Sequence, residues 1–204
     1  HMGSVTKLAC LLCLIGSIAA AQMQKDYLIH KRGMLSQTVY NTGELGRKYV
    51  TSNANTEIGI PSFEWPANSA TVVDGKQYTG QHNSYGGGVQ IAADRVDSSA
   101  RLYAFCGGMI DAVAEYINSF PLSQERIENY PVLADGSLNP AYNPNEAEEK
   151  IISKWATPVG VTITRTSRVW SFPDYDDFII YEYEFENTGD MDGNPATPAK
   201  PVRL

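Results

Sequence analysis

The most regular alternation of apolar and polar residues lies between Phe178 and Asn187. Apolar and acidic side chains occupy alternate positions there: Ile179, Tyr181, Tyr183 and Phe185 against Glu182, Glu184 and Glu186. Because successive side chains of a strand point to opposite faces, this pattern predicts a half-buried antiparallel strand with its glutamates in solvent. Val159–Val169 alternates in the same manner, and we expect it to lie antiparallel to the first segment or in a facing sheet.

Weaker patterns predict further extended segments nearer the N-terminus. The prolines within and just after Glu57–Trp65 exclude a helix in that stretch. In Thr71–Thr79, β-forming residues flank Asp74-Gly75, which is a strong signal for a tight hairpin. Three more short strands are expected at Leu35–Tyr40, Val89–Ala93 and Arg101–Phe105.

Two other segments have apolar residues at helical spacing. The first is Met109–Phe120, with Met109, Val113, Tyr116, Ile117 and Phe120 on one face. The second is Glu146–Trp155, which Pro144 would open and in which Ala147, Ile151 and Trp155 would share a face. Residues 121–145 between them are rich in Pro, Asn and Gly and are expected to form a loop.

These elements predict a mainly β fold, namely an antiparallel β-sandwich-like module with one or two short helices. The module is expected to span residues 22–190. Residues 191–204 are expected to be a loop leading into a missing C-terminal remainder, because the last predicted strand has no visible partner after it. We therefore expect the chain to be an incomplete fragment of a longer polypeptide.

The N-terminal segment has the order of a secretory signal peptide. Lys7 precedes an apolar run, Leu8–Ala21, which ends in small residues before Gln22. The run is shorter than the roughly 20 apolar residues that a membrane-spanning helix needs. We therefore expect residues 1–21 to be removed on export and to meet the membrane only then; a membrane anchor or a buried helix is the alternative. The expected location is secreted or on the cell surface.

Composition narrows the classes of partner. The formal net charge is −7, so the chain lacks the basic surface through which proteins bind nucleic acids. After removal of the signal, Cys106 would be the one remaining cysteine, in an apolar context typical of a buried thiol rather than a nucleophile. His30 and His82 show no ligand spacing for zinc, and no G-x-S-x-G motif marks a catalytic serine.

Two longer stretches carry a family resemblance. YNTGELGRKY (residues 40–49) with PSFEWPANS (residues 61–69), and the segment Glu148–Asp190, resemble the N-terminal region of large secreted surface proteins of Bacteroidetes-like bacteria. Such proteins often carry type IX secretion sorting domains and Ig-like modules. The resemblance implies export and a β-rich architecture, and it implies no catalytic residues.

One candidate metal site lies near the C-terminus. Asp190, Asp192 and Asn194 follow a D-x-D-x-N spacing that can place three oxygen ligands for Ca²⁺ in one loop. The EF-hand pattern then fails, because Pro195 stands where the turn glycine is needed. An ordinary acidic turn explains the same residues, and apart from this possible calcium no cofactor is expected.

A second candidate site lies before the last strand. Trp170, Phe172 and Tyr175 could stack on a sugar ring, with Asp176 and Asp177 as hydrogen-bonding carboxylates. Aspartates at a strand end and glutamates on a solvent face are also ordinary features of an edge strand. Two functions stay open: a non-catalytic structural or interaction module of an exported bacterial surface protein, or a carbohydrate-binding or glycoside-hydrolase-associated domain. The expected partners of the protein are the rest of its own longer chain and a surface glycan or protein.

Overall fold

The computed structural model describes residues 22–46, 61, 63–66, 71–73, 76–78, 83–84, 86–94, 101–107 and 118–200. This part of the chain contains strands and no helix. The strands are β1 (Tyr27–His30), β2 (Ser36–Tyr40), β3 (Phe63–Glu64), β4 (Thr71–Val73), β5 (Lys76–Tyr78), β6 (Gln90–Asp94), β7 (Arg101–Phe105), β8 (Phe120–Glu128), β9 (Glu149–Ala156), β10 (Val161–Val169) and β11 (Ile180–Asn187). The predicted mainly β, antiparallel fold is confirmed.

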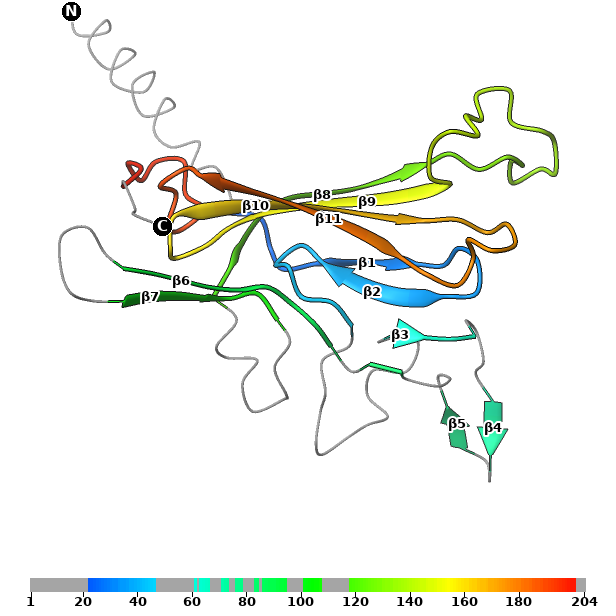
Figure 1. Ribbon diagram of the computed structural model, residues 1–204, viewed down its shortest axis with the longest axis horizontal. Helices are drawn as coiled ribbons and strands as arrows, with labels where there is room; N and C mark the ends of the chain where they lie inside the picture. The colour runs from blue at the N-terminus through cyan, green and yellow to red at the C-terminus, as the bar shows by residue number, and fades with distance from the viewer. Residues whose placement is uncertain are drawn as a thin grey trace, which may run out of the picture.

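The largest sheet has the order β11-β10-β9-β8 and is antiparallel throughout (Figure 1). Strands β9 and β10 occupy its centre, and their side chains alternate between buried and half-buried positions. Strand β11 pairs with β10 in the predicted antiparallel orientation, with Arg165 opposite Tyr183. The central pair is therefore the part of the sheet that a second layer covers.

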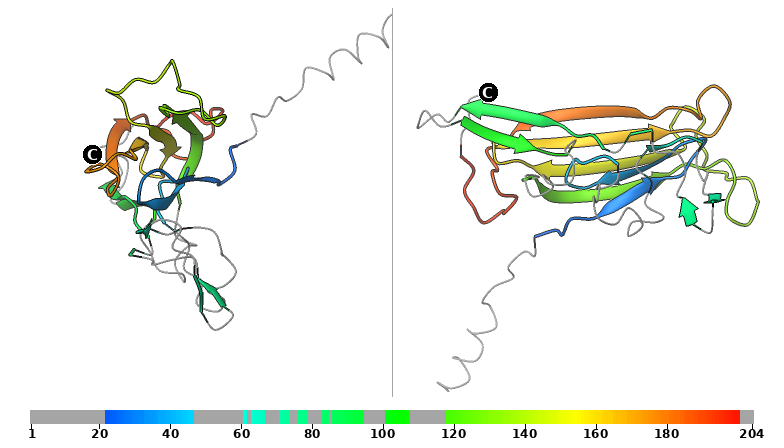
Figure 2. Two further views of the ribbon diagram at one scale, coloured as in Figure 1. Left: turned by 90° about the vertical axis from the view of Figure 1, so that its right-hand side faces the viewer. Right: turned by 90° about the horizontal axis from the view of Figure 1, so that it is seen from below.

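The second layer consists of the β1-β2-β3 sheet and the β6–β7 hairpin (Figures 1 and 2). A core cluster joins β6 and β7 to β9, β10 and the turn between them: Ala93, Ala104, Cys106, Trp155, Val159, Val161 and Ile163. Gly43 closes this packing after β2, since a Cβ atom there would lie 2.6 Å from the Trp155 ring. The arrangement agrees with a β-sandwich-like module.

The predicted helix at 146–155 is wrong, because residues 149–156 form strand β9. The face assignment was nevertheless correct, since Ala147, Ile151 and Trp155 are all buried. A spacing of four residues fits one face of a helix and one face of a strand equally well. Pairing with β8 and β10 on both sides decided between the two.

The loop predicted for residues 121–145 begins too early. Residues 120–128 form the edge strand β8, and a register shift between Pro121 and Ser123 accommodates the proline. The helix predicted for Met109–Phe120 falls mostly outside the described residues, and its last residue is the first of β8. Strand β1 was not predicted, because its four residues stand in a polar stretch.

Other expectations are confirmed. The hairpin at 71–79 is present as β4 paired with β5, and strands lie close to the predicted bounds at β2, β6 and β7. Residues 1–21 and 201–204 lie outside the described residues, as does His82. Among the described residues, no helix is long and apolar enough to cross a membrane.

Strand β11 confirms half of its predicted face assignment. Glu182, Glu184 and Glu186 are exposed as expected. Ile179, Tyr181 and Tyr183 are half-buried rather than buried, with Tyr183 packed against the core, and Phe185 is 55% exposed. The strand lies at the sheet edge, where the second layer contacts Tyr181 and Tyr183 and leaves Phe185 in solvent.

Candidate functional site

Three connections meet at one end of the sheet, on the right in Figure 1. They are the β1–β2 turn, the β8–β9 loop and the β10–β11 turn. Backbone and side-chain hydrogen bonds join them: Met34 N donates to the Asp176 carbonyl over 2.6 Å, and Ser171 Oγ donates to Glu148 over 2.6 Å. The candidate ligand-binding residues 170–177 lie in this region.

Beneath the turns, a buried polar network links β1 to the large sheet. Nδ1 of His30 lies 2.6 Å from a carboxylate oxygen of Glu149, and its Nε2 lies 2.7 Å from Oγ of Ser167. His30 and Ser167 are 0% exposed, and Glu149 is 2% exposed. Glu149 belongs to β9 and Ser167 to β10. Because side chains alternate along a strand, both point from the large sheet toward His30 on β1.

Two further side chains complete the contacts of Glu149. Tyr130 donates its hydroxyl to Oε2 over 2.8 Å, and Nε of Arg126 lies 3.5 Å from the same oxygen. Arg126 also donates to the carbonyl of Ile29 over 2.6 Å. The carboxylate thus receives bonds or ion pairs from two strands and a loop, which compensates for its burial.

The network has defined protonation preferences. Burial lowers the pKa of His30 below its ordinary 6.5, although the hydrogen bond and charge of Glu149 act in the opposite direction. Burial alone would raise the pKa of Glu149, but the contacts of His30, Tyr130 and Arg126 outweigh it and hold that pKa below its ordinary value. A neutral His30 then donates from Nδ1 to a charged Glu149 and accepts the Ser167 proton at Nε2.

The contacts follow the arrangement of a hydrolase triad, in which a base activates a serine and a carboxylate orients the base. Here the serine is Ser167, the base is His30 and the carboxylate is Glu149. A triad acts only when a substrate carbonyl can reach the serine oxygen. Ser167 is 0% exposed and also lies 3.2 Å from the carbonyl of Ile151. The arrangement can therefore hold two layers together, and it offers no access for a substrate.

An outer polar group lies between this network and solvent. Nε of Arg32 lies 2.5 Å from the Glu148 carboxylate, which also accepts the Ser171 bond. The Arg32 guanidinium lies 4.5 Å from the centre of the Tyr130 ring. Glu148 is 2% exposed, so the two donors replace the water that this carboxylate loses on burial.

The aromatic residues of the β10–β11 turn gather in one cluster, as the candidate site required. Ring centres lie 6.1 Å apart for Trp170 and Tyr175, and 5.2 Å apart for Phe172 and Tyr175. Phe178, which was not among the candidate residues, joins them at 5.7 Å from Tyr175. Tyr175 is 48% exposed and Phe178 is 36% exposed, so the cluster presents rings to solvent.

The carboxylates near this cluster differ in exposure. Asp177 is exposed, and Asp176 is half-buried with its backbone carbonyl bonded to Met34. Glu182 on β11 lies 2.8 Å from Arg168, as expected for a solvent-exposed ion pair at a sheet edge. These side chains are available as hydrogen-bond acceptors.

In the acidic loop after β11, side-chain oxygens accept hydrogen bonds from backbone amides of the same loop. Oδ1 of Asp190 accepts from the backbone N of Gly193 over 2.8 Å, Oδ1 of Asp192 from Asn194 over 2.9 Å, and Oδ1 of Asn194 from Ala196 over 3.0 Å. Among the described residues, no group of three or more His, Cys, Asp or Glu side chains could hold a metal ion. The geometry is that of successive Asx turns.

Cys106 is buried, as the sequence predicted. Nε1 of Trp155 donates to its sulfur over 3.3 Å, and burial raises the pKa of the thiol. A thiol in this state is a packing group.

Sequence reasoning missed His30, Glu149 and Ser167. Glu149 was placed in a predicted helix, and His30 lies in a stretch without apolar periodicity. The alternation of β10 offered the one usable signal, since Arg165 and Ser167 fall on the same face as Val161, Ile163 and Val169.

Comparisons of the chain with protein-family models, curated proteins and solved structures found no match. The class that can be stated is a mainly antiparallel β protein. Any function rests on the geometry described above.

Proposed function

We propose that the protein is a non-catalytic interaction module of an exported bacterial surface protein. The proposal that the module is non-catalytic rests on one observation: Ser167, His30 and Glu149 are buried inside the fold. Their polar atoms are satisfied by one another, by Tyr130 and by Arg126. Buried polar side chains that bond to one another in this way stabilise the contact between the two layers. Because they are buried, they are out of contact with a substrate that could react.

The geometry around the β10–β11 turn supports an interaction role. An antiparallel sheet with one solvated face is a rigid frame on which connections can display side chains. The cluster of Trp170, Phe172, Tyr175 and Phe178 is held at the end of such a frame and is partly exposed. Aromatic side chains that keep solvent contact are frequent in binding surfaces.

The exported location rests on the sequence. The apolar run Leu8–Ala21 after Lys7 and the resemblance of Glu148–Asp190 to secreted surface proteins both favour it. The remainder of a longer chain and a surface glycan or protein are the proposed partners. No cofactor is part of the proposal.

Two measurements on the full 204-residue chain test this function. Expressed in a bacterial host, the chain should be exported and begin at Gln22, and deletion of residues 8–21 should retain it in the cytoplasm. The exported protein should not react with a serine-directed fluorophosphonate. Labelling that disappears in Ser167→Ala but persists in Ser153→Ala, a matched buried serine on β9, would refute the non-catalytic assignment.

A further inference from the structure

We infer that the β10–β11 turn is a saccharide-binding site, in which Trp170, Tyr175 and Phe178 contact the sugar rings and Asp174 and Asp177 accept hydrogen bonds from hydroxyls. The inference rests on the proposed interaction function and names the ligand class of that surface. It draws on the shape of the aromatic cluster, its carboxylates and the contacts that hold the turn.

The rings form an angled surface rather than a flat one. Trp170 and Tyr175 meet at 62°, Tyr175 and Phe178 at 52°, and Phe172 and Tyr175 at 51°. The face of an aromatic ring carries partial negative charge, which attracts the polarised C–H groups on the face of a pyranose. Rings at different angles can therefore contact successive residues of a twisted or bent sugar chain.

Two carboxylates belong to the same turn as the aromatic rings. Asp174 and Asp177 are exposed on the same turn, and no described lysine or arginine forms an ion pair with either. A saccharide presents both C–H faces and hydroxyl donors, so it uses the rings and the carboxylates together. Such sites commonly combine an apolar surface with a few polar groups that fix orientation.

The turn is held in place before any ligand arrives. Asp174 has φ of 70°, and Tyr175 N donates to the Phe172 carbonyl over 3.1 Å. Gly33 packs so closely that a Cβ atom there would lie 2.5 Å from the Trp170 carbonyl oxygen and 2.7 Å from that of Asp176. Little conformational entropy remains to be lost on binding, which favours the weak individual contacts that sugars make.

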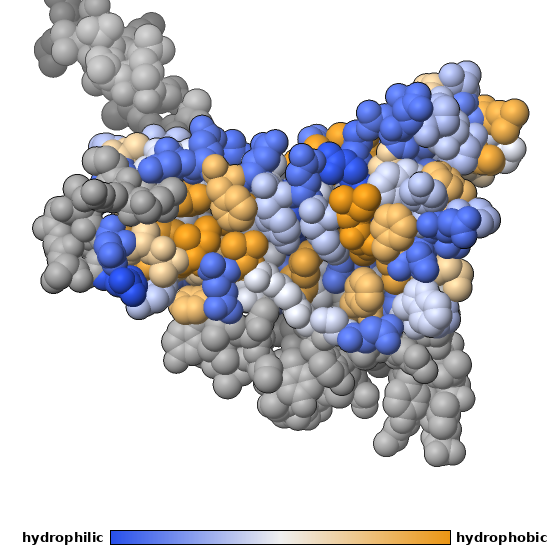
Figure 3. Space-filling model, viewed as in Figure 1, coloured by the Kyte–Doolittle hydropathy of each residue, from blue (hydrophilic) through white to orange (hydrophobic). Residues whose placement is uncertain are grey.

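The surroundings argue against a large protein partner on this surface. In Figure 3 the hydrophobic residues on the visible face form separate patches with hydrophilic residues between them. Protein partners usually cover a larger and more continuous apolar core. A basic peptide would meet the same carboxylates, but its binding would weaken with salt, whereas binding of a neutral sugar would not.

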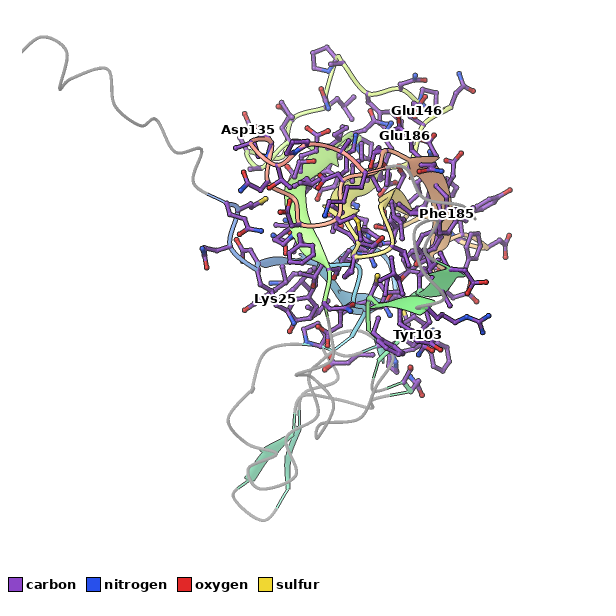
Figure 4. All side chains as sticks on the ribbon, turned by 90° about the vertical axis from the view of Figure 1, so that its left-hand side faces the viewer. Lys25, Tyr103, Asp135, Glu146, Phe185 and Glu186 are labelled. Atoms are coloured by element: carbon purple, nitrogen blue, oxygen red, sulfur yellow. The ribbon has the colours of Figure 1, made fainter. Side chains whose placement is uncertain are left out.

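The test uses the full chain and four neutral oligosaccharides: linear β-1,4-glucose, β-1,4-N-acetylglucosamine, β-1,4-xylose and β-1,4-mannose oligomers. Binding is measured by calorimetry and by the change in tryptophan fluorescence, with thermal melts to verify folding. Tyr175→Ala and Asp177→Asn remove one ring and one carboxylate at exposed positions. Phe185→Ala is the matched control, since this aromatic, labelled in Figure 4, is 55% exposed and lies near the end of β11 (Ile180–Asn187) that is remote from the turn.

We expect at least one oligosaccharide to bind, with affinity reduced about tenfold or more by Tyr175→Ala and unchanged by Phe185→Ala. Binding should also persist at high salt. No binding to the four sugars, equal affinity in all variants, or binding of an oligolysine peptide alone would overturn the inference. Release of reducing sugar ends would instead refute the non-catalytic function while leaving saccharide binding intact.

Discussion

Strands β10 and β11 are neighbours with similar alternation, yet β10 buries polar and apolar residues alike on its covered face, whereas no residue of β11 is fully buried. On its covered face β10 buries Arg165 and Ser167, both 0% exposed. On the corresponding face β11 leaves Phe185 55% exposed, directly opposite the fully buried Ile163. Position in the sheet decides burial here, because the second layer covers the central strand fully and the edge strand only in part.

The difference teaches that polar groups can be core residues when each finds partners. Arg165 donates from Nη1 to the Gly43 carbonyl and from Nη2 to the Tyr40 carbonyl, each over 2.7 Å, and it lies over the Trp155 ring. Its Nε has no hydrogen-bond partner, which is the imperfect part of the arrangement. The exposed Phe185 of β11 has no polar atom in its side chain and carries no such demand.

The largest effect is expected from Arg165→Ala. It would leave the carbonyls of Gly43 and Tyr40 unpaired and open a cavity beside Trp155, so the free energy of unfolding should fall by about 3 kcal/mol or more. Arg168→Ala is the control on the opposite face of β10, where a solvent-exposed pair with Glu182 is lost at under about 1 kcal/mol. Urea melts that rank the two in reverse would show that buried Arg165 does not stabilise the fold.

The next largest effect separates two aromatics of β11. Tyr183→Ala should lower the free energy of unfolding by about 2 kcal/mol, because Tyr183 packs against the core cluster. Phe185→Ala should lower it by less than about 1 kcal/mol, as for an exposed residue. Equal losses in denaturant melts would mean that the edge of the sheet is covered in solution.

A smaller effect concerns pH and the buried histidine. Since burial holds the pKa of His30 below 6.5 in the folded protein, the unfolded chain takes up the proton first as pH falls. The stability that neutral His30 contributes is complete above pH 6.5 and is lost progressively below it, at up to about 1.4 kcal/mol per pH unit. Melts of the wild type and His30→Gln between pH 8 and 5 should show a flatter profile for the variant across this window.

The smallest effect is expected from Glu184→Gln. Glu184 is exposed on the solvent face of β11, so the change in unfolding free energy should stay below about 0.5 kcal/mol. A larger loss in a denaturant melt would mean that this face contacts another part of the chain and that the strand is not solvated on that side.

The sequence predicted β10 and β11 well because their alternation is long and uninterrupted. It failed at β9, where the spacing of Ala147, Ile151 and Trp155 satisfies two periods and the preceding proline favoured a helix. Burial of Phe185 was overestimated because alternation reports a face and says nothing of whether another layer covers it. Strand pairing supplies what was missing, and pairing depends on distant residues.

The residues of the candidate site also differ in whether the sequence could predict them. The aromatic cluster could be predicted since Trp170, Phe172 and Tyr175 are close in the chain and share one turn. The His30 network could not, because its partners Glu149 and Ser167 lie 119 and 137 residues away. Local chemistry can be read from neighbours in sequence, whereas a buried network exists only once the layers meet.

These long separations in sequence also predict the order in which the strands form during folding. The β9–β10 and β10–β11 pairs close short connections, whereas β1 reaches its anchors only after a loop of more than a hundred residues has closed. We therefore expect the backbone amides of β1 to be among the last to gain protection in pulsed hydrogen exchange; protection of His30 before Ile163 would contradict this order. Until β9 and β10 have formed, the β1–β2 hairpin lacks its buried partners, which would suit the export proposed above.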